Sequence, residues 1–492
     1  MNASLTTLEI LVLVLGTVLL LADFWMPAER KKYLAYFAAV ALGGLLLAGF
    51  SDSSFCNTFG TAFNGSFVQD AFALFFKRFF IVAAILVLFV TAEFSDRISG
   101  GIAEFYSLIV FALAGMLFAA SANDFAMLFV SIELITVTFY VLTSFQRARL
   151  GSLEAGVKYL IIGALSSAFM VFGIALILGT TGKINFTELA QVAPQFADNK
   201  VFLTGVLFLL VGLGFKISIV PFQIWTPDVY QGAPTPTTAF LAVGSKAAGF
   251  VLLLRFLFAA IPAITTSTHW VNFLIIISGA TILFGNLCAI PQRNLKRLLG
   301  YSSIAHAGYL MLGVAAVSAM GQAAILYYLS GYLFTVVAAF LVIALVMRHL
   351  ENEDISALAG LSQRSPVLAA TLTLAMVSLA GVPPLAGFFG KFLLLKAVIQ
   401  QAQTTGNHGY YCLVFTALAG VLISFYYYFG VIRAIYWSKD AKDLSPIELS
   451  GAAKFCIVLC IAGMLWLGIF PNTIVEATRT ASDAFWSTIV VH

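Results

Sequence analysis

Four lysines lie inside long apolar runs of this chain or beside a break in one, where charge is least easily tolerated. They are Lys158, Lys216, Lys246 and Lys391, and Glu133 in another apolar run supplies a possible counter-charge. Placing an ammonium group in hydrocarbon costs about 2.5–3.5 kcal/mol even on a lenient insertion scale, so such residues usually pair or line a polar path. The pattern therefore indicates a charge relay inside a membrane.

Most of these residues also have a purely structural interpretation. Glu133 can be a protonated carboxyl group that hydrogen-bonds to a neighbouring helix. Lys158 has Glu154 one helical turn before it, which is the spacing of an ordinary ion pair. Lys216 and Lys391 can extend their apolar stems so that the charge reaches the membrane interface. The sequence leaves both interpretations open.

The surroundings of each position favour a functional role. Lys216 and Lys391 adjoin predicted helix breaks, where freed carbonyl groups and water can solvate a proton. Lys246 lies among small residues at 243–249, which allow close helix approach, so we expect it to face protein. His306 could connect two lysine sites because its charge changes near physiological pH, with a neutral packing histidine as the alternative. The candidate relay comprises Glu133, Lys158, Lys216, Lys246, His306 and Lys391.

Several other charged residues lie nearer to span ends or lack a partner. We interpret them as interfacial anchors, and they are Lys77, Arg78, Glu93, Arg255 and Lys396. Lys77 and Arg78 lie deeper in their apolar run than interfacial anchors usually do, and the sequence alone gives no role for them.

The composition identifies a membrane protein. Of the 492 residues, 61% are hydrophobic and only 10% are charged, whereas soluble domains carry about 25% charged residues. The net charge of +4 is scattered through loops, so nothing indicates nucleic-acid binding. The first apolar run, 5–26, lacks a basic leader and a cleavage site and is expected to be a retained span. The five cysteines have no metal or redox spacing, and no cofactor motif is visible.

Apolar length predicts an all-α polytopic protein with about fourteen transmembrane helices. The predicted spans lie near 5–26, 33–50, 70–94, 103–121, 124–146, 153–180, 201–220, 236–260, 270–290, 298–318, 321–347, 366–402, 409–435 and 452–470.

The basic residues of the loops support this number and orient the chain. With the amino terminus outside, the odd-numbered connections hold Arg30, Lys31, Lys32, Arg97, Arg147, Arg149, Arg293, Lys296, Arg297, Arg348, Arg364, Arg433, Lys439 and Lys442. The even-numbered connections and the two ends hold only Lys183, Lys200 and Arg479. Because cytoplasmic loops are enriched in Lys and Arg, both termini are predicted on the periplasmic side.

Proline and glycine interrupt the seventh and twelfth spans. Pro221, Pro227, Pro234 and Pro236 follow the seventh, and Gly381, Pro383, Pro384, Gly387 and Gly390 lie within the twelfth. Breaks five spans apart predict two repeats, helices 4–8 and 9–13, which are inverted because five is odd. The predicted parts are 1–100 with helices 1–3, 101–262 and 263–437 with the two repeats, and 438–492 with a cytoplasmic loop and helix 14.

At this point the motifs resemble a known family, the antiporter-like membrane subunits of respiratory complex I, and most closely its N type. The resemblance covers nearly the whole chain. Its carriers are the span around Glu133 and the stretches 154–160, 214–222, 225–236, 292–297, 301–309 and 387–391. The residues Val-Tyr-Gln-Gly at 229–232 discriminate most sharply, because L- and M-type subunits differ there. M-type subunits also usually carry a glutamate where this chain has Lys391.

The resemblance implies a role for each matched residue. Glu133 and Lys216 would form the charged pair of a first half-channel, which Lys158 modulates. Lys246 would be the central relay, and Lys391 the carrier of a second half-channel, reached through the region of His306. One position departs from the family, because many relatives have a histidine where this chain has Gln223, and an amide does not titrate.

The family also implies the setting in which the chain works. We expect a proton-translocating membrane subunit of an NADH:quinone oxidoreductase in a bacterial inner membrane, without a redox centre of its own. NADH, FMN, iron–sulfur clusters and quinone would belong to partner subunits. Its neighbours would be M- and K-type subunits and the lateral helix of an L-type subunit. The main alternative is an Mrp-type cation/proton antiporter subunit, and a purely structural scaffold is another. The sequence leaves the quinone, the choice between proton and sodium, and the direction of the half-channels open.

Overall fold

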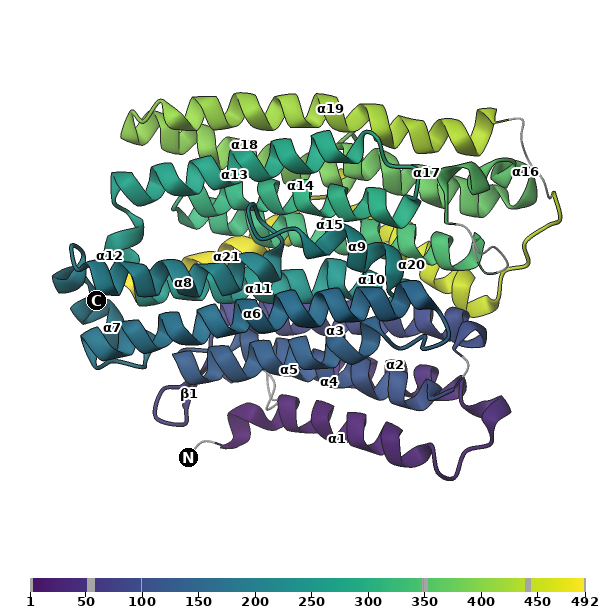
Figure 1. Ribbon diagram of the computed structural model, residues 1–492, viewed down its shortest axis with the longest axis horizontal. Helices are drawn as coiled ribbons and strands as arrows, with labels where there is room; N and C mark the ends of the chain where they lie inside the picture. The colour runs from purple at the N-terminus through teal and green to yellow at the C-terminus, as the bar shows by residue number, and fades with distance from the viewer. Residues whose placement is uncertain are drawn as a thin grey trace.

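The computed structural model describes residues 3–50, 58–98, 100–346, 348, 353–438 and 444–490. Long helices run side by side along one direction and form a bundle, and the two ends of the chain lie at the same end of it (Figure 1). The strands of the described part form one small antiparallel hairpin of β1 (Gly60–Ala62) and β2 (Phe67–Gln69). The predicted all-α class is confirmed.

The helices of the first half are α1 (Thr7–Ala22), α2 (Tyr33–Ala48), α3 (Ala71–Phe94), α4 (Ile102–Ala120), α5 (Phe125–Thr143), α6 (Leu150–Thr181), α7 (Phe186–Val192), α8 (Lys200–Ile217), α9 (Trp225–Gly232), α10 (Thr235–Phe240) and α11 (Lys246–Leu254). Those of the second half are α12 (Pro262–Thr265), α13 (Thr268–Ala289), α14 (Leu295–Ala315), α15 (Ala319–Val346), α16 (Leu361–Arg364), α17 (Pro366–Ala380), α18 (Ala386–Thr405), α19 (Gly409–Trp437), α20 (Gly451–Ile469) and α21 (Asn472–Val490). Short 3₁₀ turns lie at Ala3–Thr6, Ala28–Arg30, Ser95–Arg97, Ala193–Phe196 and Ile355–Leu358.

Every predicted span contains an apolar helix. Within the described residues, twelve helical segments are long and apolar enough to cross a membrane. The other two predicted spans correspond to the shorter α2 and to the interrupted pair α17 and α18. The polytopic membrane fold is therefore established, while the number of fourteen crossings and the inverted relation of the repeats stay predictions.

The degree of enclosure separates central helices from peripheral ones. In the most apolar stretch of the segment Thr235–Ala260 every residue is buried. In the corresponding stretches of α6 and α19, only 28% and 33% of the residues are buried. Exposed side chains such as Phe415, Leu422 and Tyr426 give α19 an apolar outer surface. Segment 235–260, which carries Lys246, therefore lies at the core of the bundle.

Both predicted breaks are present, and the central segment adds an irregularity that the sequence did not indicate. Helix α8 ends at Ile217, after which Ser218 adopts a left-handed φ of 63°, and α17 ends before Gly381 with a φ of 87°. Two π-helical turns, η6 (Leu241–Ser245) and η7 (Arg255–Ala260), flank α11. Such turns are frequent at functional sites, and η6 ends directly before Lys246.

Helix α21 was not predicted. The part 438–492 was expected to hold only a cytoplasmic loop and helix 14. In the structure, α21 is amphipathic and packs on α15 and α3. Its buried side includes Thr478, Ala481, Ser482 and Phe485. The helix is stabilised by the face with which it covers the bundle.

Candidate functional site

Lys216 is buried in the last turn of α8, next to the first break. Its side chain is 3% exposed, and Nζ donates to Thr136 Oγ1 at 2.9 Å and to the Tyr159 hydroxyl at 3.4 Å. Helix α11 packs closely here, because a Cβ atom on Gly249 would lie 3.2 Å from Lys216 Cγ. Lys216 thus faces the protein interior, and its ammonium group is held by hydroxyl groups.

Glu133 lies near Lys216 without touching it. It is one turn before Thr136 on α5, and its Oε1 accepts a hydrogen bond of 2.5 Å from Ser167 of α6. Among the described residues, no ion pair within 4 Å joins Glu133 to Lys216. In this state the carboxyl group is bonded to a neighbouring helix, as the structural interpretation predicted.

Lys246 lies at the centre of the bundle and is bound by one residue of α14. Its Nζ donates to both the backbone carbonyl and the side-chain oxygen of Ser303. Ser303 Oγ also contacts the hydroxyls of Tyr230, at 3.0 Å, and Tyr332, at 3.2 Å. The side chain of Lys246 is 1% exposed, and this hydroxyl cluster is its polar environment.

His306 is three residues beyond Ser303 on α14 and contacts two tyrosines. Nδ1 faces the Tyr328 hydroxyl, and Nε2 lies 3.0 Å from the Tyr428 hydroxyl. The Tyr428 hydroxyl in turn contacts Ser302 Oγ. The histidine is buried among groups that can each donate or accept a proton, so both its relay and its packing interpretations stay open.

Lys391 binds the second helix break directly. Its Nζ donates to the carbonyls of Leu379, at 2.8 Å, and Ala380, at 3.0 Å, which are the last residues of α17. The same atom lies 4.9 Å from the centre of the Tyr309 ring. The ammonium group therefore satisfies carbonyls that lose their helical partners where the chain turns at Gly381.

Together these contacts form a nearly continuous polar series through the core. The Tyr159 hydroxyl, which binds Lys216, also interacts with Ser245, the residue before Lys246. Beyond Ser303, the Tyr332 and His306 rings are 5.1 Å apart, and the His306 and Tyr309 rings are 6.0 Å apart. Hydroxyl groups that sequence reasoning missed thus lie around Lys216, Lys246 and His306: Tyr159, Tyr230, Ser302, Ser303, Tyr328, Tyr332 and Tyr428. Lys391 adjoins this series through the Tyr309 ring.

Lys158 lies elsewhere. It is partly exposed and makes ion pairs of 2.7 Å with Glu154 and with Asp228 of α9, which also contacts Arg297. The i,i+4 ion pair between Glu154 and Lys158, which the structural interpretation predicted, is thus present. The next residue, Tyr159, is the one that contacts Lys216.

Gln223, the position that departs from the family, lies in the break after α8. It is 6% exposed, and its side-chain oxygen is buried with no hydrogen-bond donor in the described part of the protein.

Two of the residues that were expected to be interfacial anchors are instead buried, and each forms an ion pair with an acidic residue. Lys77 is 1% exposed and pairs with Glu9 of α1 at 2.6 Å, and its Nζ also donates to Gln69 at 2.8 Å. Arg255 is 2% exposed and pairs with Asp70 at 2.9 Å. The interfacial interpretation of Lys77 and Arg255 was wrong, because their partners lie far away in the sequence. Of the others, Lys396 is exposed.

The Lys77–Glu9 pair gives a stability prediction. We expect Lys77→Met to destabilise the protein by about 3–5 kcal/mol, because it leaves the Glu9 carboxylate buried without a cation. Adding Glu9→Gln should recover most of that loss, since a neutral pair needs no counter-charge. The thermal unfolding midpoint of the purified protein measures both effects, and a single variant as stable as the parent would contradict the prediction.

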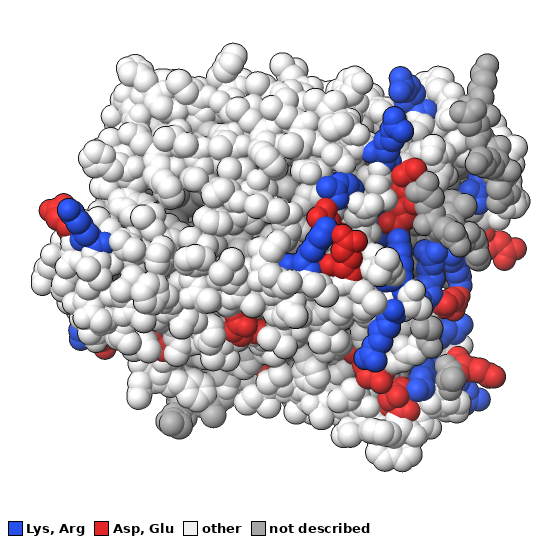
Figure 2. Space-filling model, viewed as in Figure 1, with Lys and Arg blue, Asp and Glu red and all other residues white. Residues whose placement is uncertain are grey.

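Charged residues on the surface are concentrated at one end of the molecule. Figure 2 shows Lys, Arg, Asp and Glu gathered on the right, at the opposite end from the termini, while most of the remaining face is uncharged. This matches the predicted segregation of basic loops. Lys439 and Lys442 lie outside the described residues.

Comparison with known proteins identifies the relatives of this chain. The family described as "NADH:quinone oxidoreductase/Mrp antiporter, TM" matches residues 122–420. A NADH-quinone oxidoreductase subunit N of Desulforamulus reducens is 38% identical over 484 residues, which cover 98% of this chain and 99% of that protein. A chain of respiratory complex I from Thermus thermophilus aligns with a TM-score of 0.79 and 31% identity, over 96% of this chain and 99% of that one. A chain of an Mrp complex from Dietzia has the same fold, with a TM-score of 0.78 and 21% identity over 99% and 98% of the two chains.

Proposed function

The chain belongs to the subunit N family of NADH-quinone oxidoreductases, and from this membership we propose that it translocates protons across the membrane as part of such a complex. One observation carries the proposal. Lys216, Lys246 and Lys391 are all buried in the bundle core, and hydroxyl groups and His306 connect their surroundings. Buried ionisable groups at membrane depth generally mark ion pathways.

In the proposed mechanism each lysine alternates between ammonium and neutral amine. A proton leaves Lys216 through the Tyr159 hydroxyl towards Ser245 and Lys246, and continues through Ser303, Tyr332 and the His306 region to Lys391. Hydroxyl groups suit this transfer because each both donates and accepts a hydrogen bond.

Glu133 is proposed to control the first step. Two opposite charges 4 Å apart attract by about 4 kcal/mol at an effective dielectric constant of 20. A Glu133 carboxylate that moves from Ser167 towards Lys216 would therefore hold the proton there, and its return would release it. Lys158, which pairs with Asp228 at a partly exposed cluster, would modulate this half of the relay through the adjacent Tyr159.

Redox chemistry is proposed to occur in other subunits. NADH, FMN, iron–sulfur clusters and quinone would be held there, and quinone reduction would supply the energy. M- and K-type subunits and the lateral helix of an L-type subunit would cover part of the apolar outer surface, and lipid the rest. The proposed location is the bacterial inner membrane, because the relatives are bacterial, and the distribution of basic residues predicts both termini in the periplasm.

Purification of the tagged chain from its native membrane tests this function. We expect peripheral subunits and a flavin to co-purify, and NADH oxidation by the reconstituted complex to drive proton uptake into vesicles. Recovery of a complex without flavin that exchanges sodium for protons would support the Mrp-type alternative instead.

A further inference from the structure

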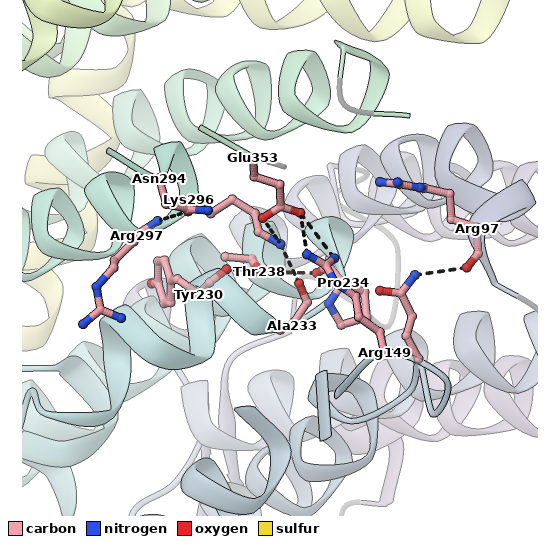
Figure 3. A network of polar contacts seen from close by, with 11 residues as sticks. Arg97, Arg149, Tyr230, Ala233, Pro234, Thr238, Asn294, Lys296, Arg297 and Glu353 are labelled. Atoms are coloured by element: carbon pink, nitrogen blue, oxygen red, sulfur yellow. Dashed lines mark hydrogen bonds and ion pairs between the residues drawn. The ribbon is translucent and has the colours of Figure 1, made fainter. Parts of the chain in front are cut away.

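A second group of buried charges lies at the end of the bundle where surface charges gather. At its centre, Glu353 is 3% exposed and lies in the segment after α15. It pairs with Lys296 of α14 at 3.1 Å and with Arg149, just before α6, at 3.2 Å. Figure 3 shows the Glu353 carboxylate between these two cations. The group joins the two predicted repeats.

Lys296 is the one cation of this group that can release a proton. Arg97 also interacts electrostatically with Arg149 and Glu353, so three cations surround one carboxylate. A guanidinium group stays protonated under all physiological conditions, whereas a lysine can become a neutral amine. Lys296 is completely buried, and Arg149 is 37% exposed. Solvent therefore reaches the group on the Arg149 side.

Lys296 faces the same elements that surround Lys246. Its Nζ donates to the Ala233 carbonyl at 2.8 Å, between α9 and α10. Ser303, the partner of Lys246, is two helical turns further on α14 and therefore on the same face. Helix α9 lies against this face, because a Cβ atom on Gly300 would be 3.1 Å from Pro227 Cα. The same helix supplies Tyr230, whose hydroxyl contacts Ser303.

A small cavity lies beside the hydroxyl cluster of Lys246. Its volume is about 10 Å³, and the residues that line it include Tyr230, Ser302 and Tyr332 and also Leu299, one turn from Lys296. This is room for about one water molecule, which needs two to four polar partners. The three hydroxyl-bearing residues can provide them.

We propose that Lys296 is a second proton-loading site for Lys246, required in each cycle in addition to Lys216, and that Glu353 and Arg149 hold it in place. This inference rests on the proton-translocating function proposed above. In the transfer, the Lys296 side chain turns past Leu299 towards the cavity, an Nζ–H bond breaks, and its proton passes to a water molecule there. That water gives up another proton, which moves through the hydroxyls of Tyr230 and Ser303 and forms an Nζ–H bond on neutral Lys246. The neutral Lys296 then takes a proton from solvent on the Arg149 side.

Proton uptake by the whole complex in vesicles tests the proposal. We expect Lys296→Met to lower the NADH-driven uptake rate at least about tenfold, since a positioned proton donor typically contributes about a hundredfold or more. The double variant Lys296→Met/Glu353→Gln removes both charges of the buried pair, and Arg149, which loses its partner, is partly exposed to solvent. It should remain as slow, because the proton carrier is still missing.

The single Lys296 variant is compared with the double variant, and both are compared with Lys246→Met. Recovery of uptake in the double variant would overturn the proposal, since it would show that the ion pair only stabilises the fold, and parental uptake in Lys296→Met would do the same. If the single variant does not assemble, the double variant alone decides. Lys246→Met serves as the reference variant. If it takes up protons at the parental rate, the proposed function itself fails. If it loses proton uptake while both Lys296 variants take up protons normally, only the inference about Lys296 is rejected. Lys183→Met, a lysine 40% exposed and paired with Glu188, is the matched control.

Discussion

A complex that carries Lys216→Ala is expected to assemble and yet lose about nine-tenths or more of its proton pumping and of the turnover coupled to it. This loss is a lower bound, because a positioned proton donor typically contributes about a hundredfold or more in enzymes. The physical reason is local. Thr136 and Tyr159 bind the ammonium group of Lys216, and alanine leaves these hydroxyls without any group that stores a proton.

The same helix offers a matched control. Lys200 lies in the first turn of α8 and is exposed, so Lys200→Ala should pump as the parent does. NADH-driven acidification of inverted membrane vesicles measures both variants, and the amount of assembled complex is determined in parallel. Full pumping by an assembled Lys216→Ala complex would refute the assignment of Lys216.

The second large effect is expected at Lys391. Lys391→Met removes both a proton carrier and the donor that binds the Leu379 and Ala380 carbonyls, so it should abolish most pumping and also destabilise the break after α17. Each buried carbonyl left unsatisfied costs about 1–3 kcal/mol. Lys391→Arg separates the two roles, because a guanidinium group can bind the carbonyls and cannot release its proton.

The two variants should therefore differ in stability and agree in function. We expect the Arg variant to have a higher thermal unfolding midpoint than the Met variant, with proton uptake equally low in both. Lys396→Met, five residues further along α18 and exposed, is the control and should behave as the parent. Normal pumping by the Arg variant would show that Lys391 only stabilises the break.

The sequence predicted the large-scale organisation because membrane physics leaves strong local signals. Apolar length marked the spans, and the prolines after Val220 and the pair at Pro383 and Pro384 marked the breaks. It also predicted that Lys391 would lie where carbonyls are freed, and the contacts with Leu379 and Ala380 show this. These features depend on residues that are neighbours in the chain.

The missed features depend on contacts between distant residues. Nothing local indicates that Glu9 pairs with Lys77, or that Glu353 meets Lys296 and Arg149. The chain has 17 tyrosines, and no spacing rule separates Tyr159 from the others, although it follows Lys158 in a motif that the family resemblance had already marked. Helix α21 was missed for a related reason, since only the surface it covers explains its stability.

The central claim is that buried lysines pass protons to one another through the core, and Lys246 is the position where this is tested most directly. Lys246→Met keeps the length and packing of the side chain and removes its charge, in the most enclosed segment of the bundle. The measurement is proton uptake by vesicles that contain the assembled complex, recorded together with NADH oxidation. The account predicts that uptake falls at least about tenfold. Uptake at the parental rate, with the complex fully assembled, would contradict it.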